Sequence, residues 1–222
     1  MEIVDESKRG LSRRTLIGSA AVMAALPISV RADAQSSLDR VDTVGALLVV
    51  EPQKFIYDEP YIEVREIVRR IAVLASAFRE RRFPVFLLKI TEASPGRGRT
   101  QAAIPAHSTS PGWTDLVPEL NQHSTDLVLT KPRWGGFIGT TLDYDLRQRD
   151  VTEVFVTGIA TSIGVESTAR EAYDFGYNVV AIVDAMTDRT AIEHEHSVEK
   201  IFPRLGVPAD MKTVLAALKR DR

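Results

Sequence analysis

Residues 154–172, VFVTGIATSIGVESTAREA, constrain the fold of this chain more than any other segment. They begin with a β-branched and aromatic run, pass through Gly158, and continue with Val165, Ala169 and Ala172 at helical spacing. The pattern predicts a strand that turns directly into a helix. The first N–H groups of such a helix, together with its dipole, stabilise an anion or a developing oxyanion.

The rest of the sequence alternates between strand and helix patterns. Residues 44–50 are a continuous apolar run, as expected for a strand buried on both faces. This alternation predicts an α/β fold, a three-layer αβα sandwich with a mainly parallel, doubly wound sheet. Further strands are expected at residues 84–90, 127–129, 154–157 and 179–183, and helices at 61–81, 140–148, 162–175, 190–202 and 209–220.

Ligands of such a sheet bind beyond the carboxyl ends of its strands. Glu51, Lys131 and residues 159–164 each follow a predicted strand, so we expect them to converge at one edge. Residues 91–124 form a long segment rich in Gly, Pro, Ser and Thr, which predicts a loop that walls the same site.

The N-terminal region has the pattern of an export signal. Twin arginines in residues 12–18, SRRTLIG, precede an apolar run over 20–30 and an Ala-x-Ala site at 32–34. This pattern predicts a twin-arginine export signal over residues 1–34, a linker over 35–42 and one domain over 43–222. The apolar run is short for a membrane span, so we expect an exported protein, periplasmic or extracellular, with no stable span after processing. An uncleaved N-terminal anchor is the alternative.

Composition excludes one class of function and gives no support to another. The chain has no cysteine, so thiolate chemistry is excluded and the core must supply stability without disulfides. Its formal net charge is −2, which gives no electrostatic reason to expect a nucleic-acid partner. We expect a small-molecule substrate or ligand and a homo-oligomer.

Three segments resemble the motifs of the isochorismatase-like hydrolases, a family of the cysteine hydrolase superfamily. They are ALLVVEPQ at 46–53, DLVLTKPRWGGFIGTTLDYDLR at 126–147, and GIATSIGVESTAR at 158–170. The resemblance covers about residues 42–205. In it, Lys131 matches the catalytic lysine, Glu51 stands where the family has a catalytic aspartate, and Gly164 replaces the nucleophilic cysteine. The last segment resembles a glycine-bearing branch that lacks this cysteine.

The resemblance implies hydrolysis without a covalent intermediate, since isochorismatases also have glycine at that position. Glu51 would be the general acid and base that protonates the enol carbon of a vinyl ether, and Lys131 would bind the substrate carboxylate or orient water. The family also implies a cis peptide near residues 159–160. The predicted binding and oxyanion pocket consists of Ile159, Ala160, Ser162, Ile163, Gly164, Trp134 and Phe137.

Two differences from isochorismatases bear on this prediction. Glu51 is longer than aspartate by about 1.5 Å, and Ser162 stands where those enzymes have a histidine. Glu51 could instead form a salt bridge at a strand end, and Lys131 could be a solvated surface lysine. Gly164 could be only a small residue at a close helix–sheet contact, and Trp134 and Phe137 could belong to the core or to a subunit interface.

Three other functions compete with this hydrolase. The first is a catalytically inactive family member that binds a small molecule. The second is a metal-dependent nicotinamidase, but its ligand set is not visible, and we expect neither a metal nor a cofactor. The third is a hydrolase with Thr161 or Ser162 as nucleophile, for which no histidine stands at a recognisable partner position.

Overall fold

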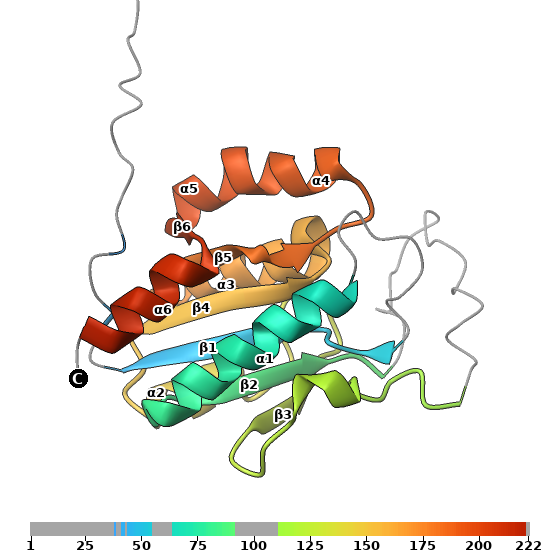
Figure 1. The fold of residues 1–222 in the computed structure, drawn as a ribbon, viewed down its shortest axis with the longest axis horizontal. Helices are drawn as coiled ribbons and strands as arrows, with labels where there is room; N and C mark the ends of the chain where they lie inside the picture. The colour runs from blue at the N-terminus through green and yellow to red at the C-terminus, as the bar shows by residue number, and fades with distance from the viewer. Residues whose placement is uncertain (1–37, 39–40, 43, 55–63, 92–110, 221–222) are drawn as a thin grey trace, which may run out of the picture. The chain divides into compact units, whose positions relative to one another are not determined.

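The computed structural model describes residues 38, 41–42, 44–54, 64–91 and 111–220, all within one compact unit, Ser36–Arg222. In this described part, one six-stranded sheet has the order β3-β2-β1-β4-β5-β6, and all neighbouring strands are parallel (Figure 1). The strands are β1 (Gly45–Val50), β2 (Val85–Lys89), β3 (Leu127–Thr130), β4 (Glu153–Ile159), β5 (Asn178–Thr187) and β6 (Val207–Ala209).

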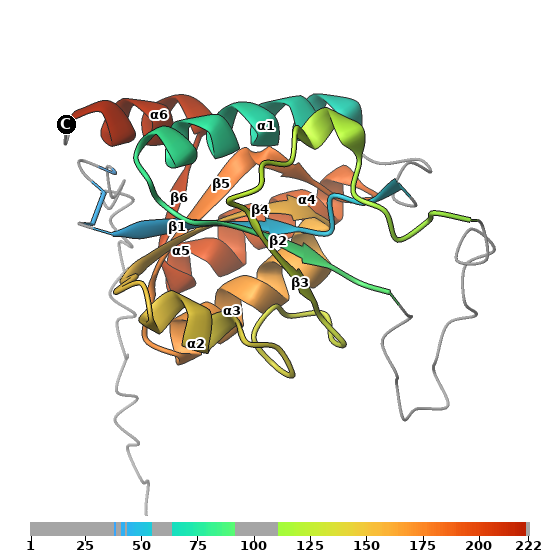
Figure 2. The same cartoon turned by 90° about the horizontal axis from the view of Figure 1, so that it is seen from below.

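Helices cover both faces of the sheet (Figure 2). One face carries α1 (Val64–Glu80) and α6 (Met211–Arg220), and the other carries α2 (Leu142–Arg147), α3 (Glu166–Asp174) and α5 (Phe202–Leu205). The predicted three-layer αβα sandwich with a parallel sheet is therefore confirmed. The remaining helical segments are η3 (Pro118–Leu120), η4 (Thr161–Val165), α4 (Ala191–His196) and η5 (Ser197–Ile201).

The central strand β1 explains why its sequence is apolar throughout. Leu47 and Val49 belong to the core cluster under α1 and α6, whereas Leu48 and Val50 belong to the cluster under α2 and α3. All six residues of β1 are buried. A polar side chain at any of these positions would lose its water without a compensating hydrogen bond, so the strand carries none.

The sheet order determines where a ligand site can form. From β1 the chain proceeds outward through β2 and β3, and then returns to β4 on the other side of β1. The order therefore reverses between β1 and β4, where α/β sheets bind their ligands. The two strands are paired so closely at this point that a Cβ at Gly158 would collide with the Val50 carbonyl. Gly158 also has φ +124°, a conformation that favours glycine.

Several predicted boundaries differ from the structure. Strand β5 extends to Thr187, beyond residue 183, and its pairing with β4 shifts register between Val156 and Gly158. The short strand β6 was not predicted, because three residues that include a proline carry no strand pattern. The helix expected over 190–202 forms as α4, η5 and the start of α5, and that over 162–175 begins as the π-helical turn η4.

Parts of the predicted organisation lie outside the described residues. These are the leader over 1–34, residues 61–63 of the first predicted helix, and residues 92–110 of the long loop. Leu38 and Val41, from the predicted linker, are buried in the core. Within the described part of the chain, no helix combines the length and apolar character that a membrane span requires.

Candidate active site

Glu51 and Lys131 form a close ion pair where β1 and β3 end. The Lys131 Nζ lies 2.5 Å from the Glu51 Oε1, and the Lys131 side chain is fully buried. The same Nζ also donates to the carbonyl oxygens of Arg133, at 3.0 Å, and Trp134, at 2.9 Å. These three acceptors account for the three protons of an ammonium group. The alternative of a solvated surface lysine is therefore wrong.

Burial dominates the electrostatics of this pair. It raises the pKa of the Glu51 carboxyl above its ordinary value of 4.5, although the charge and hydrogen bond of Lys131 act in the opposite direction. A carboxyl with a raised pKa holds its proton closer to neutral pH than an ordinary glutamate does. Such a group can serve as a general acid, because it has a proton to give and a cation beside it once the proton has left.

Gly164 lies directly beside the Glu51 carboxyl. A Cβ built on Gly164 would be 3.0 Å from the Glu51 Oε1 and 2.9 Å from the Val50 Cγ1. The structure thus brings together Glu51, Lys131 and Gly164, which lie far apart in the sequence. Glu51 follows β1, Lys131 follows β3, and Gly164 lies in η4. This point is also the edge at which the strand order reverses.

The turn after β4 commits several of its N–H groups within the protein. The peptide bond between Ile159 and Ala160 is cis, as the family resemblance implied. The Ser162 N–H donates to the Asp188 Oδ2 at 2.6 Å, and the N–H groups of Ile163 and Val165 donate to the Ala160 carbonyl at 3.2 and 3.1 Å. Ser162 and Ile163 belong to the predicted pocket, and their backbone N–H groups already have acceptors within the protein.

Trp134 and Phe137 differ in their surroundings. The Trp134 side chain is largely exposed, and its backbone carbonyl is the part that contacts Lys131. Phe137 is buried and stacks on Phe175, with ring centroids 5.2 Å apart, next to Tyr177. The structure therefore places Phe137 in the core, one of the alternatives to its predicted pocket role that the sequence left open.

The first residue of η4, Thr161, makes a buried contact with a histidine. The Thr161 Oγ1 is 2.9 Å from the His194 Nδ1, and both residues are buried. Burial lowers the pKa of His194, which favours its neutral form. His194 is thus a partner of Thr161 that does not stand at a recognisable position in the sequence. No sequence signal could have predicted this contact, because the two residues are 33 positions apart and follow different strands.

Glu171 of α3 holds the loop that contacts Lys131. Its Oε2 accepts a hydrogen bond from the Phe137 N–H at 2.8 Å. A Cβ on Gly135 would collide with the same carboxylate, so only glycine fits there without rearrangement. Glu171 thus fixes the segment that supplies the Arg133 and Trp134 carbonyls, and sequence analysis did not find it.

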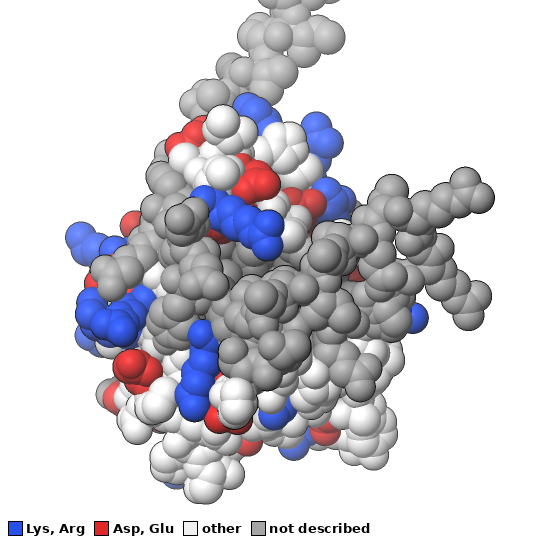
Figure 3. Space-filling model, turned by 90° about the vertical axis from the view of Figure 1, so that its right-hand side faces the viewer, with Lys and Arg blue, Asp and Glu red and all other residues white. Residues whose placement is uncertain are grey.

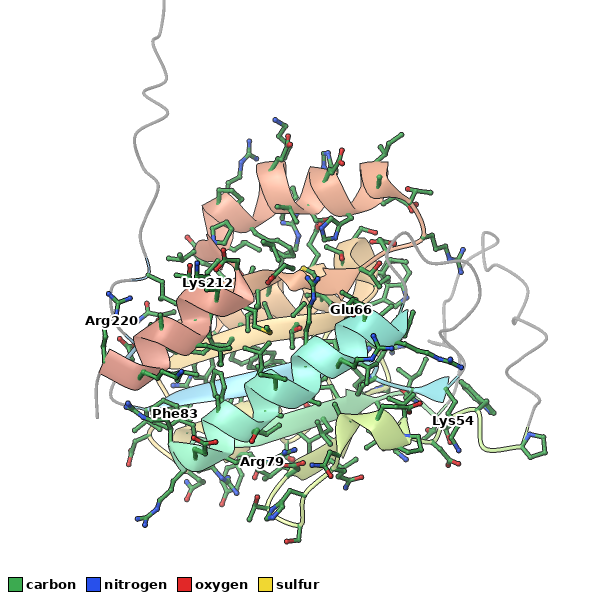
Figure 4. All side chains as sticks on the ribbon, viewed as in Figure 1. Lys54, Glu66, Arg79, Phe83, Lys212 and Arg220 are labelled. Atoms are coloured by element: carbon green, nitrogen blue, oxygen red, sulfur yellow. The ribbon has the colours of Figure 1, made fainter. Side chains whose placement is uncertain are left out.

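The edge of the sheet carries charges of both signs. Figure 3 shows Lys and Arg side chains interspersed with Asp and Glu on this side, among the described residues. Lys54 lies beyond the end of β1 (Figure 4) and pairs with Asp115 at 3.0 Å. In the part of the chain that the structure describes, no group of three His, Asp or Glu side chains is placed to hold a metal ion; His107 lies outside this part.

Comparison with known proteins identifies a family over most of the chain. The family model of the isochorismatase domain matches residues 45–213. An isochorismatase family protein from Burkholderia thailandensis superposes with a TM-score of 0.74 at 36% sequence identity, covering 82% of this chain and 98% of that protein. The uncharacterized isochorismatase family protein YecD from Escherichia coli O157:H7 is 34% identical over 157 residues, covering 69% of this chain and 84% of YecD.

Two further relatives match over shorter segments. The uncharacterized isochorismatase family protein YwoC from Bacillus subtilis is 44% identical over 107 residues, 48% of this chain and 57% of YwoC. The ureidoacrylate amidohydrolase RutB from Acinetobacter baylyi is 34% identical over 113 residues, 50% of this chain and 46% of RutB. The chain therefore aligns with about half the length of each of these two relatives.

Proposed function

The chain belongs to the isochorismatase family, and on this basis we propose that it hydrolyses a small carboxylate-type molecule without a covalent enzyme intermediate. The observation that carries the proposal is the buried pair of Glu51 and Lys131 beside Gly164. Because the chain has no cysteine, it cannot use the thiolate route. We assign it on the same ground to a glycine-bearing branch of the family.

In this mechanism Glu51 is the proton-transferring group. For a vinyl ether, Glu51 gives its proton to the enol carbon, and the resulting oxocarbenium ion is captured by water. The water returns one proton to Glu51 and forms a hemiketal. The hydroxyl proton of the hemiketal then passes to the leaving oxygen as the carbon–oxygen bond breaks, and a carbonyl compound and an alcohol leave. The raised pKa of the Glu51 carboxyl supports the first step, since burial shifts its equilibrium toward the protonated form.

Lys131 acts on Glu51 rather than on the substrate. All three acceptors of its ammonium are protein oxygens, so contact with a substrate carboxylate would require one of these hydrogen bonds to break. A cation 2.5 Å from the carboxyl stabilises the anion that forms once Glu51 has given up its proton. We therefore assign Lys131 to charge stabilisation and to positioning of Glu51.

The turn after β4 supplies the site for an anionic oxygen. Since Ser162 and Ile163 already donate within the protein, we assign this role to the N–H groups of Ala160 and Gly164. A carboxylate or a developing oxyanion bound to these two N–H groups would be stabilised by their dipoles. The Ile159 side chain is buried in the core cluster that includes residues of α1 and α6.

A non-catalytic binding protein is the second candidate. It is favoured by the same hydrogen bonds, because a lysine with three protein acceptors is also suited to a static structural role. The similarity to RutB adds amide and urea bonds to the linkages worth testing. Export through the twin-arginine leader remains a proposal, since the leader lies outside the described residues. Assembly into a homo-oligomer is likewise a proposal.

The test is hydrolysis of a panel of small vinyl ethers, amides and ureas that carry a carboxylate. The wild-type chain is compared with Glu51→Gln, Lys131→Met and the control Lys212→Met on α6, far from the site (Figure 4). We expect one class to be turned over, with at least a 10²-fold loss in Glu51→Gln and no loss in the control. Binding of panel members by folded wild-type protein without turnover would support the second candidate instead.

A further inference from the structure

Gly164 is not required by the conformation of its own backbone. It lies in the helical turn η4, outside the left-handed region that favours glycine. Glycine in a helix is unfavourable relative to alanine, because it loses more conformational freedom on folding. The reason for a glycine at this position must therefore be the space around it.

That space is occupied by the proposed catalytic acid. A Cβ on Gly164 would lie 3.0 Å from the Glu51 Oε1 and 2.9 Å from the Val50 Cγ1, both closer than ordinary van der Waals contact. The third neighbour, the Ile159 carbonyl oxygen, would be at an ordinary 3.5 Å. The Glu51 carboxyl thus lies where a side chain at position 164 would begin.

Glu51 cannot easily move to make room. Its carboxyl is held by Lys131 at 2.5 Å, and Lys131 is itself fixed by two backbone carbonyls. The Glu51 backbone has φ +50°, a strained conformation for a residue with a side chain, and its N–H donates to the Leu88 carbonyl at 2.7 Å. Such strain persists only where the surroundings fix the residue in place.

We propose that Glu51 and Gly164 are a sterically matched pair, in which the length of the acid requires glycine at 164 and Gly164 in turn positions the carboxyl. An aspartate at 51 would be shorter by about one carbon–carbon bond, roughly 1.5 Å, and would remove the contact of its carboxyl with a side chain at 164, leaving the Val50 contact. Gly164 is thus a positioning residue. Its consequence for catalysis rests on the proposed function, but the steric pairing does not.

The test introduces Gly164→Ala into three backgrounds of the full chain: wild type, Glu51→Gln and Glu51→Asp. The urea midpoint of each single and double variant gives the penalty of the added methyl group. Glutamine has the length of glutamate without its charge, so it separates size from electrostatics. We expect the same midpoint loss in the wild-type and Glu51→Gln backgrounds, and at most half of it in Glu51→Asp.

The Val50 contact is present in all three backgrounds, so only the difference between penalties is informative. Equal penalties in all three would overturn the proposal, as would relief in Glu51→Gln, which would indicate charge rather than length. If the Gly164→Ala chains do not fold, the same set in a Val50→Ala chain removes the second close contact and gives the answer.

Failure of this proposal can be told apart from failure of the proposed function. Unfolding midpoints need no substrate, so the pairing can stand even if no variant hydrolyses anything. If the chain is a hydrolase, Glu51→Asp/Gly164→Ala should turn over substrate faster than Gly164→Ala alone. Rescue of the midpoint without any rescue of turnover in an active enzyme would contradict the positioning role of Gly164.

Discussion

Replacing Lys131 by methionine tests the buried pair most directly. The substitution keeps an unbranched side chain but removes the cation from the Glu51 Oε1 and the donor from the Arg133 and Trp134 carbonyls. Removing one partner of a buried ion pair costs about 3–5 kcal/mol. Since the Glu51 side chain is 15% exposed and its carboxyl can be neutralised by a proton, we expect about 3 kcal/mol at pH 8.

The cost should depend on pH in a defined direction. Without Lys131, the two effects that lower the pKa of Glu51 disappear and only burial, which raises it, remains. The folded state of the variant then binds the carboxyl proton more tightly than the unfolded chain, whose carboxyl has its ordinary pKa near 4.5. The variant therefore loses stability as the pH rises from about that value through the raised pKa, so the loss should be smaller at pH 5 than at pH 8.

Urea unfolding of the wild type and Lys131→Met at both pH values measures this difference. Adding Glu51→Gln to Lys131→Met should recover part of the loss at pH 8, because no buried charge is left unpaired. The control is Lys54→Met, which removes a cation from an exposed pair with Asp115 and should cost at most about 1 kcal/mol. A loss below about 1 kcal/mol at pH 8 for Lys131→Met, or one independent of pH, would refute the reasoning.

Substitutions at three other positions have defined outcomes in urea unfolding. Burial raises the pKa of Glu153 from 4.5 to about 7, so the folded state loses stability as the pH rises from about 4.5 through 7. Glu153→Gln should therefore gain about 1–2 kcal/mol at pH 8 and little at pH 5. Glu171→Ala leaves the Phe137 N–H without its acceptor and should cost about 1–3 kcal/mol, whereas Glu171→Gln, which keeps an oxygen, should cost less. Thr161→Val removes the hydroxyl beside His194 and should cost about 1–2 kcal/mol; complete loss of turnover in this folded variant would favour Thr161 as nucleophile over Glu51.

Local patterns were sufficient to predict most of the layers. The apolar run of β1 is buried on both faces because helices cover the sheet on both sides, and a continuous hydrophobic sequence reports this directly. The repeating spacing of α1 likewise reports one buried helix face. Strand β6 was missed because three residues that include a proline form a strand only through their pairing with β5.

The motifs identified Glu51, Lys131 and Gly164 as a set, but they could not give the distances among them. Sequence also left Lys131 with two possible roles, on the surface or in the site. Its burial and its three acceptors follow from β3, the loop after it and β1, which meet only in the folded sheet. The same holds for the Glu171 contact with the loop, which spans 34 positions of the sequence.

The sequence by itself determined the α/β class and the absence of thiol chemistry, because these depend on periodicity and composition. Its resemblance to family motifs singled out Glu51 and Lys131 as the candidate acid and lysine. Only the tertiary structure decided that Thr161 meets His194, that Ser162 donates to Asp188, and that the carboxyl of Glu51 fills the space above Gly164. Each of these contacts joins segments that follow different strands. Their spacing is set by the order and pairing of the whole sheet, which no local pattern encodes.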